Sequence, residues 1–286
     1  MGMWETPFSI FPYFNGRGTR EYFPLNPHNQ KRGCQMRCLY REHRYICGQY
    51  MEIEHYPVFE VKRSGRAPKR KPSSETQKRH NDIAAKRKII RLAHTNFTPD
   101  DIRFDLTYNE GNYPESAEAA QKQMQNFLRR LRRYRRRHDL PELKYIGVTE
   151  VGKTNKRFHH HILLNCGDMK PRDLADLWGR GYTKIAPLQF NDTGIVDLAK
   201  YMIKEPILGK RWLASRNIQP PKEVVRDGRI SAKKIREYAI SAADNRDEFE
   251  KRYEGYRLSE ITPYFNDVNG AFYVSIFMRK DERRKR

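Results

Sequence analysis

Apolar and polar residues alternate along several short stretches of this chain, and apolar residues recur at helical spacing between them. Residues 102–108 alternate in this way, which predicts a strand with one buried face. Residues 144–150 and 157–165 predict two further strands, joined by a turn that contains Gly, Lys and Asn. A fourth strand is expected within residues 47–60.

The longest helical pattern covers residues 116–138, where Ser116 suits the N-cap and Pro141 lies beyond the end. Its apolar stripe consists of Met124, Phe127, Leu128, Leu131 and Tyr134. The other faces carry seven arginines between Arg129 and Arg137. We therefore expect this helix to pack its apolar stripe on a sheet and to expose basic side chains.

The remaining pattern predicts helices over residues 80–94, 171–178 and 193–204, a charged helical region over 231–253, and a hairpin of residues 257–265 and 271–279. Strands and helices mix without a strict βαβ rhythm, so we expect an α+β fold with a central antiparallel β-sheet flanked by helices.

Three parts are expected along the chain. Residues 1–95 form a basic N-terminal arm and linker with a helix, and within them residues 1–45 show no sustained period and predict an irregular arm. Residues 96–217 form the core. Residues 218–286 form a C-terminal extension, with the helical region and the hairpin packed on the core.

The charge of the chain points to a polyanionic partner. Its 286 residues include 57 Lys and Arg against 35 Asp and Glu, a net charge of +22. Such a surface repels itself unless a polyanion is near, so nucleic acid is the expected partner. No apolar run approaches the roughly 20 residues of a membrane span. The N-terminus lacks the pattern of a secretory signal, so we expect a cytoplasmic protein without a membrane partner.

The four cysteines are Cys34, Cys38, Cys47 and Cys166. With His43 nearby a zinc site is one interpretation, but their spacing contains no pair of CxxC motifs. Reduced thiols are the favoured interpretation.

One predicted strand carries the run His159-His160-His161. Successive side chains of a strand point to opposite faces, so His159 and His161 project together while His160 points the other way. Two imidazoles on one rigid strand provide half of a site for a divalent cation. Glu150 ends the preceding strand, and the turn after it folds this carboxylate back beside His159 as the expected third ligand. A surface histidine tract is the alternative, and the apolar run 162–164 favours a buried, positioned strand.

The predicted helix 193–204 presents Tyr201 on its polar side, with Lys204 one turn away. A phenol can attack a phosphodiester when a metal polarises the phosphoryl oxygens, and a lysine can steady the scissile phosphate. By itself Tyr201 would be one of 17 tyrosines, at the edge of an ordinary amphipathic helix. The histidine strand upstream is what favours its interpretation as a nucleophile.

Three motifs thus stand in order along the chain: the hydrophobic-Thr strand Phe104-Asp105-Leu106-Thr107-Tyr108, Glu150 followed by the histidine run, and the YxxK sequence Tyr201-Met202-Ile203-Lys204. Together they resemble the HUH endonuclease superfamily, in particular its single-tyrosine rolling-circle replication initiators. Residues 212–217 also resemble a stretch that follows the tyrosine helix in initiators of the bacterial plasmid and phage type.

The resemblance implies an HUH endonuclease or RRM-like core that nicks one DNA strand at an origin. It implies that His159, His161 and Glu150 bind Mg²⁺ or Mn²⁺, that Tyr201 forms a 5′-phosphotyrosine linkage and that Lys204 assists. A free 3′-OH would then serve a polymerase. The implied partners are single-stranded or cruciform origin DNA and a host polymerase and helicase, in the cytoplasm of a bacterial host.

This sequence departs from the family at two positions. His160 occupies the middle of the histidine motif, where the family prefers an apolar residue, and Glu205 stands where two-tyrosine initiators have their second tyrosine. A mechanism with two alternating tyrosines on this helix is therefore not implied. The 286 residues also contain no Walker-type phosphate loop, so no helicase is expected on this chain.

Basic residues in two places are expected to contact DNA phosphates. Lys153, Lys156 and Arg157 lie in the turn beside the histidine strand. The long helix contributes Arg129, Arg132, Arg133 and Arg136, for part of which a solvated polar face is the alternative. Two other functions stay open: a transposase or relaxase of the same superfamily, and a non-catalytic basic nucleic-acid-binding protein whose histidines are incidental.

Overall fold

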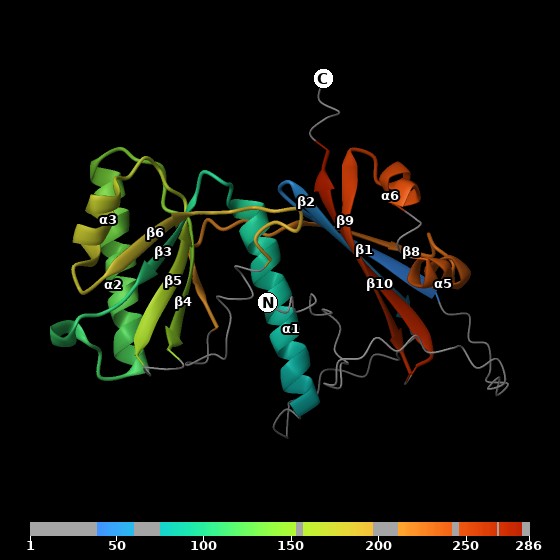
Figure 1. The fold of residues 1–286 in the computed structure, drawn as a ribbon, viewed down its shortest axis with the longest axis horizontal. Coiled ribbons are helices and arrows are strands. Elements are labelled where there is room, and N and C mark those ends of the chain that lie inside the picture. Colours follow the sequence, from blue (N-terminus) through green and yellow to red (C-terminus); the bar gives the residue numbers. More distant parts are fainter. Residues whose placement is uncertain are drawn as a thin grey trace, which may run out of the picture. The chain divides into compact units, whose positions relative to one another are not determined.

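The structure is a computed structural model that describes residues 39–59, 75–152, 157–196, 211–241, 246–267 and 269–281. For residues 75–80 it describes the backbone alone. The chain divides into two compact units (Figure 1). The inserted unit comprises Ile46–Tyr50 and Ala84–Lys222, and the flanking unit comprises the described parts of Met1–Tyr45, Met51–Ile83 and Glu223–Arg286. One unit is thus inserted, in sequence, within the other.

The inserted unit is built on a five-stranded sheet with the order β6-β3-β5-β4-β7. Its strands are β3 (Ile102–Leu106), β4 (Tyr145–Val151), β5 (Phe158–Leu164), β6 (Thr183–Pro187) and β7 (Leu213–Ala214), and every pair is antiparallel. Two helices, α2 (Ala117–Arg137) and α3 (Pro171–Trp178), lie on one face of this sheet, and the short 3₁₀ helix η1 (Glu110–Asn112) precedes α2 (Figure 1). The predicted α+β fold with an antiparallel sheet and flanking helices is confirmed.

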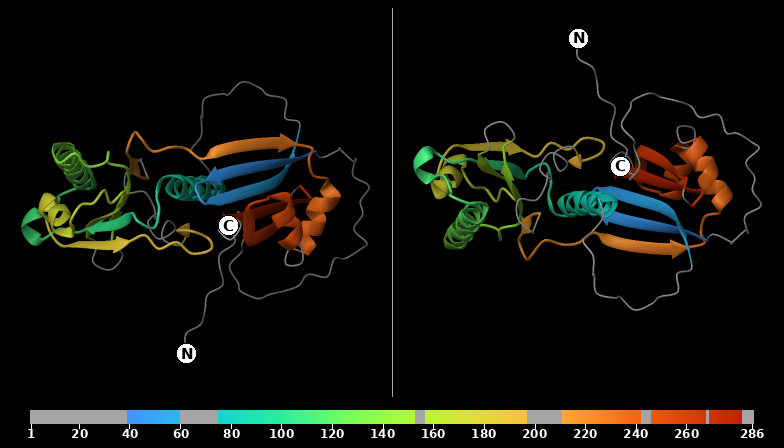
Figure 2. Two further views of the ribbon diagram at one scale, coloured as in Figure 1. Left: turned by 90° about the horizontal axis from the view of Figure 1, so that it is seen from above. Right: turned by 90° about the horizontal axis from the view of Figure 1, so that it is seen from below.

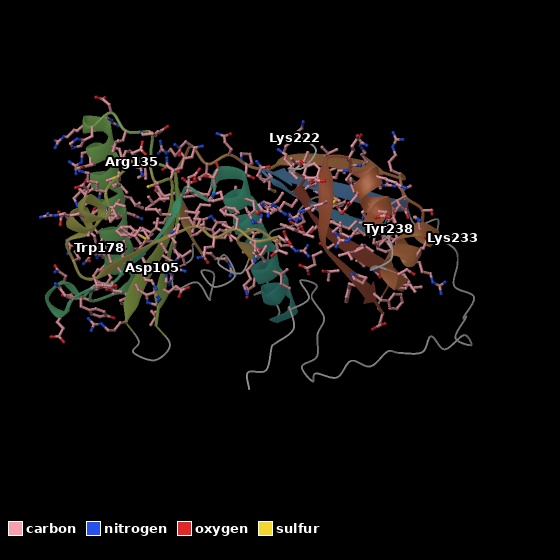
Figure 3. All side chains as sticks on the ribbon, turned by 45° about the horizontal axis from the view of Figure 1, so that its top comes forward. Asp105, Arg135, Trp178, Lys222, Lys233 and Tyr238 are labelled. Carbon is pink, nitrogen blue, oxygen red and sulfur yellow. The ribbon has the colours of Figure 1, made fainter. Side chains whose placement is uncertain are left out.

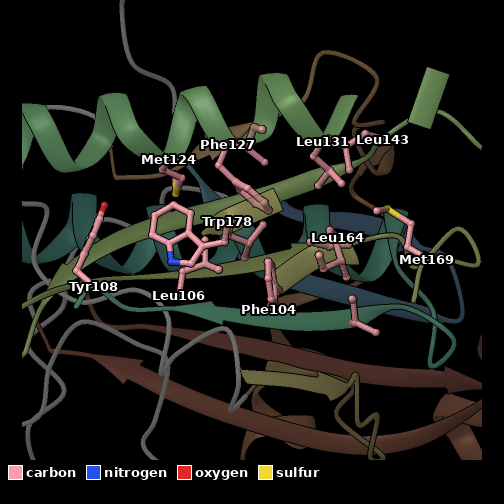
Figure 4. Close-up of a cluster of buried hydrophobic side chains, with 14 residues drawn as sticks. Phe104, Leu106, Tyr108, Met124, Phe127, Leu131, Leu143, Leu164, Met169 and Trp178 are labelled. Carbon is pink, nitrogen blue, oxygen red and sulfur yellow. The ribbon is translucent and has the colours of Figure 1, made fainter. Parts of the chain in front are cut away.

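The core of this unit lies between the sheet and the two helices. Alternate strand residues, among them Phe104, Leu106 and Leu164, meet the predicted apolar stripe of α2 and the ring of Trp178 from α3 (Figure 4). Because neighbouring residues of a strand point to opposite faces, the residues between these core positions lie on the face that α2 and α3 leave uncovered.

Helix α2 has the start that the sequence predicted, since Ser116 Oγ accepts a hydrogen bond from the Ala119 amide. Near its other end Arg135 is 1% exposed. The guanidinium group of Arg135 donates to Asn165 Oδ1 at 2.9 Å, to the Cys166 carbonyl at 2.9 Å and to the Asn165 carbonyl. Burial lowers the pKa of Arg135. One of the seven arginines therefore ties α2 to the loop after β5.

The flanking unit is built on a second five-stranded sheet, with the order β8-β1-β2-β10-β9. Its strands are β1 (Leu39–Cys47), β2 (Tyr50–Val58), β8 (Lys222–Asp227), β9 (Tyr256–Asn266) and β10 (Ala271–Lys280). Helices α5 (Ala232–Ile240) and α6 (Arg246–Arg252) lie beside the long C-terminal strands (Figure 2). Its core includes Ile53, Ile235, Tyr238, Phe249, Val274, Ile276 and Met278, each fully buried. Helix α1 (Glu75–Asn96) contributes residues to both units.

The hairpin expected near the C-terminus is confirmed as β9 and β10, and the expected charged helical region is divided into α5 and α6. One expectation was wrong, because residues 39–45, expected in an irregular arm, belong to β1. Residues 222–227, for which no element was predicted, form the edge strand β8. The boundaries expected near residues 95 and 217 stay a prediction.

Strand β1 escaped prediction because its polar residues are satisfied by distant partners. Arg41 forms an ion pair with Asp227 at 2.7 Å, and His43 contacts Glu223 at 3.0 Å. One of its buried positions is the charged residue Glu42, so the sequence of β1 lacks the alternation of apolar and polar residues that predicts a strand.

None of the helices formed by the described residues combines the length and apolar character that crossing a membrane requires.

Candidate metal centre

Glu150, His159 and His161 converge on the face of the inserted unit's sheet that lies opposite α2 and α3. The antiparallel register of β4 and β5 sets Glu150 opposite His159. One potential ligand atom from each of the three residues lies within 4.8 Å of the others. Glu150 Oε2 is 3.3 Å from His159 Nε2 and 3.8 Å from His161 Nε2. The pair of histidines and the upstream carboxylate therefore meet as the sequence predicted.

Both imidazoles have their other ring nitrogen occupied. His161 Nδ1 lies 2.6 Å from Asp105 Oδ1, and His159 Nδ1 lies 3.3 Å from the Arg157 carbonyl oxygen. In the tautomer with the proton on Nδ1, each of these oxygens accepts a hydrogen bond and Nε2 is left to bind a metal ion. Hydrogen bonding of this kind orients histidine ligands in metal sites.

Asp105 is the functional residue that sequence reasoning missed. It lies on β3, opposite His161 on β5, and its other oxygen forms an ion pair with Arg103 at 3.0 Å. The sequence did indicate the face on which Asp105 lies, because a residue between the core residues Phe104 and Leu106 must point away from α2 and α3. What the sequence did not show is that β3 pairs with β5 in this register.

His160 lies on the covered face, as strand parity predicted, and is fully buried. Its Nε2 is 2.6 Å from the Tyr108 hydroxyl and its Nδ1 is 2.9 Å from Thr149 Oγ1. Burial, with smaller contributions from His159 and His161, lowers the pKa of His160 to about 3. His160 is thus a neutral core residue, which accounts for a histidine where an apolar residue was expected.

The donor set fits a divalent cation. Two imidazole nitrogens and a carboxylate give three ligands from two rigid neighbouring strands, and Glu150 and His161 are only 3% and 5% exposed. Oxygen donors favour Mg²⁺ or Mn²⁺, whereas imidazoles also suit later transition metals, so the identity of the ion is not fixed by this set.

A groove lies on the same face of the sheet, beside Asp105. It has a volume of about 600 Å³, and its lining includes Arg103, Lys184, Gln189 and Asn191. Lys184 on β6 pairs in register with Asp105 on β3. Two cationic side chains therefore adjoin the metal ligands on the uncovered face, although neither was among the expected DNA contacts.

The expected DNA-binding residues are distributed differently. Arg129, Arg132, Arg133 and Arg136 belong to α2, which covers the face opposite the metal ligands. Arg157 donates to the Tyr108 carbonyl at 3.1 Å and stacks on the Tyr113 ring at 5.1 Å. Lys153 and Lys156 lie outside the described residues, as do the expected nucleophile Tyr201 and its helper Lys204.

The chain is anchored directly before the segment that contains Tyr201. The Ile195 amide donates to the buried His94 Nε2 at 3.0 Å, and the His94 ring stacks on Tyr50. Gly194 has a φ of +73°, and a Cβ at this position would lie 2.1 Å from His94 Nε2. Only glycine fits this approach, so the contact with His94 holds residues 194 and 195 in place.

Residues 103–206 match the family model described as replication-associated protein ORF2/G2P. The matched segment begins in β3, contains the three candidate metal ligands and ends two residues after Lys204. The match supports a replication initiator. Neither the comparison with curated proteins nor that with solved structures gives a match to this chain.

Proposed function

We propose that this protein is a replication initiator that nicks one strand of origin DNA, with Glu150, His159 and His161 holding Mg²⁺ or Mn²⁺ and Tyr201 as the nucleophile. The observation that carries the proposal is the convergence of the three ligands on one sheet face, opposite α2 and α3, within a segment that matches a replication-associated family.

In the proposed reaction the Tyr201 hydroxyl oxygen attacks the phosphorus of the scissile phosphodiester. A bond forms between this oxygen and phosphorus, the bond from phosphorus to the 3′ oxygen breaks, and the phenolic proton is released. The leaving 3′ oxygen takes up a proton and becomes the 3′-OH that a host polymerase extends. A bound divalent ion supplies polarisation of the phosphoryl oxygens and stabilises the leaving oxygen. Lys204 contributes a positive charge near the phosphate.

The protein's own groups do the positioning. Asp105 and the Arg157 carbonyl oxygen hold the two imidazoles with Nε2 turned toward Glu150. Arg103 and Lys184, in the groove beside Asp105, offer cations to the backbone of a DNA strand that approaches along this face. The DNA substrate in this proposal is single-stranded or cruciform origin DNA in a bacterial host.

The test is covalent capture. The protein is incubated with Mn²⁺ and single-stranded oligonucleotides from candidate origins, and adducts are separated on a denaturing gel. We expect an adduct with wild-type protein and with Tyr182→Phe, which alters a tyrosine of the same unit that is 73% exposed. Tyr201→Phe should abolish the adduct and keep DNA binding, and EDTA should abolish it in every variant. An adduct that persists in Tyr201→Phe rules out this nucleophile.

The same assay separates the two alternatives. A transposase or relaxase of the same superfamily would form the adduct on transposon-end or transfer-origin sequences and not on replication origins. A non-catalytic nucleic-acid-binding protein would bind these oligonucleotides, with a strong dependence on salt, and form no adduct with any of them.

A further inference from the structure

The flanking unit contains a pocket lined by arginines. It has a volume of about 430 Å³ and is lined by Glu42, Arg44, Arg226, Arg229 and Arg252. Arg44 and Glu42 come from β1, Arg226 from the neighbouring edge strand β8, Arg229 from the turn after it, and Arg252 from the end of α6. Four guanidinium groups thus meet around one carboxylate.

The carboxylate of Glu42 is a buried anchor for two of these arginines. Its side chain is 1% exposed, and its Oε1 accepts from Arg44 Nε at 2.7 Å. Its Oε2 accepts from Arg252 Nη2 at 3.1 Å and from the Tyr253 hydroxyl at 2.8 Å. Both oxygens are therefore already occupied, and the role of Glu42 is to fix Arg44 and Arg252 in place.

The charges of the pocket do not balance. Burial opposes ionisation of Glu42, but hydrogen bonds from His55 and Tyr253 and the charge of Arg44 outweigh it and hold the pKa of Glu42 well below its usual range. The lining thus carries one negative charge against four positive ones. Within the described part of the chain, no acceptor pairs with Arg226 or Arg229, and the buried Nε of Arg252 has no hydrogen-bond partner.

Glu42 holds Arg44 and Arg252 in place, while Arg226 and Arg229 are exposed and have no acceptor among the described residues, and guanidinium groups with spare donors bind phosphate. A guanidinium group presents five N–H donors in a planar fork, and only part of those on Arg44 and Arg252 are used by Glu42. We propose that this pocket binds a backbone phosphate of nucleic acid, at a second site that belongs to a different unit from the metal centre. The chain's net charge of +22 favours a nucleic acid over a small free anion.

The experiment measures binding without cleavage, with full-length protein in EDTA. Fluorescence anisotropy reports the affinity for labelled single-stranded and duplex oligonucleotides of unrelated sequence over a series of salt concentrations. The pocket variant is Arg226→Ala/Arg229→Ala. The control is Lys233→Ala/Arg236→Ala, which removes the same charge from exposed positions of α5 in the same unit, and neither residue lines the pocket. Figure 3 labels Lys233 on this helix.

The pocket variant should bind all sequences about tenfold more weakly, and its salt slope should fall by about one for each phosphate that it no longer binds. The control should remain within about twofold of wild type, since the side chains that it removes bind no phosphate. Equal reductions of affinity in the two variants, or unchanged affinity in both, would overturn the proposal. Arg226→Lys/Arg229→Lys keeps the charge and removes the fork, and wild-type affinity in this variant would show that net charge alone matters.

A second measurement separates backbone phosphate from free phosphate. Thermal unfolding is compared in sodium phosphate and in sodium chloride of equal ionic strength. If phosphate stabilises the wild type but not the pocket variant, while both bind oligonucleotides equally, the pocket takes a free phosphate and the nucleic-acid proposal is wrong. These measurements need neither Tyr201 nor a metal. They therefore test the phosphate site independently of the proposed nicking activity.

Discussion

The two sheets of this protein each have five strands and helices beside them, yet their polar clusters differ in kind. In the inserted unit a carboxylate and two imidazoles bring together the donor atoms that suit a cation. In the flanking unit one buried carboxylate lies among four guanidinium groups, which suit an anion. The fold class is thus compatible with either kind of ligand, and the balance of charged side chains across neighbouring strands decides between them.

The largest effect that would sharpen this comparison is expected from His161→Ala. Removal of one of the three candidate ligands should reduce Mn²⁺-dependent adduct formation about a thousandfold. Its matched control is His160→Ala, which removes the neighbouring imidazole from the opposite face. That variant should keep its metal and lose about 2 kcal/mol of unfolding free energy, because Tyr108 and Thr149 lose their partner. Isothermal titration with Mn²⁺ and urea unfolding distinguish the two, and equal metal loss in both variants would break the assignment.

In the flanking unit, Glu42→Gln removes the anchor of Arg44 and Arg252. We expect a loss of about 3 kcal/mol in unfolding free energy at neutral pH, with metal binding unchanged. The folded-state pKa of Glu42 is depressed, so its stabilising contribution is present above the usual carboxyl value of 4.5 and is lost as the pH falls toward the folded pKa. Acid should therefore destabilise the wild type more than the variant. A variant with the same acid sensitivity as the wild type would contradict this account.

A smaller effect is expected from Asp105→Asn in the inserted unit. An amide keeps the shape but accepts less strongly from His161 Nδ1, so affinity for Mn²⁺ should fall about 10- to 100-fold. The direct measurement is metal titration. The control is Asp101→Asn in the same unit, which should leave metal affinity unchanged. The Asp101 carboxylate accepts hydrogen bonds from the backbone amides of Thr98 and Cys166.

The smallest effect concerns the two faces of the inserted unit's sheet. Arg129→Ala/Arg133→Ala on α2 should weaken DNA binding only about twofold to threefold, since α2 covers the face away from the metal ligands. Arg103→Ala/Lys184→Ala removes the same charge from the metal side and should reduce adduct formation more. If the α2 variant has the larger effect on adduct formation, the DNA does not approach along the groove.

Features that depend on residues close together in the sequence could be predicted, and features that depend on residues far apart in the sequence could not. The histidine strand, the parity of His160 and the extent of α2 were all readable because each depends on neighbours within a few residues. Asp105 was missed because its partner His161 lies 56 residues away, across a strand pairing that no local pattern encodes.

The arginine pocket was still harder to predict from the sequence. Arg252 meets Glu42 across 210 residues of sequence, and β1 carries no apolar alternation that would have marked it as a strand. Tyr201 and Lys204 are the reverse case. Their assignment rests on the sequence and on the family match, and it stays a prediction because they lie outside the described residues.

The insertion of one unit within the other has a consequence for synthesis. The inserted unit is complete once residue 222 has been made, whereas β1 and β2 must wait for β10, which ends at Lys280. At about 5 to 20 residues per second, the ribosome needs on the order of 10 to 40 seconds to make the chain between β2 and the end of β10. Throughout that time the outer edge of β2 has no partner, and an unpaired strand edge is prone to aggregation. We therefore expect the nascent chain to be prone to aggregation until β10 pairs with β2.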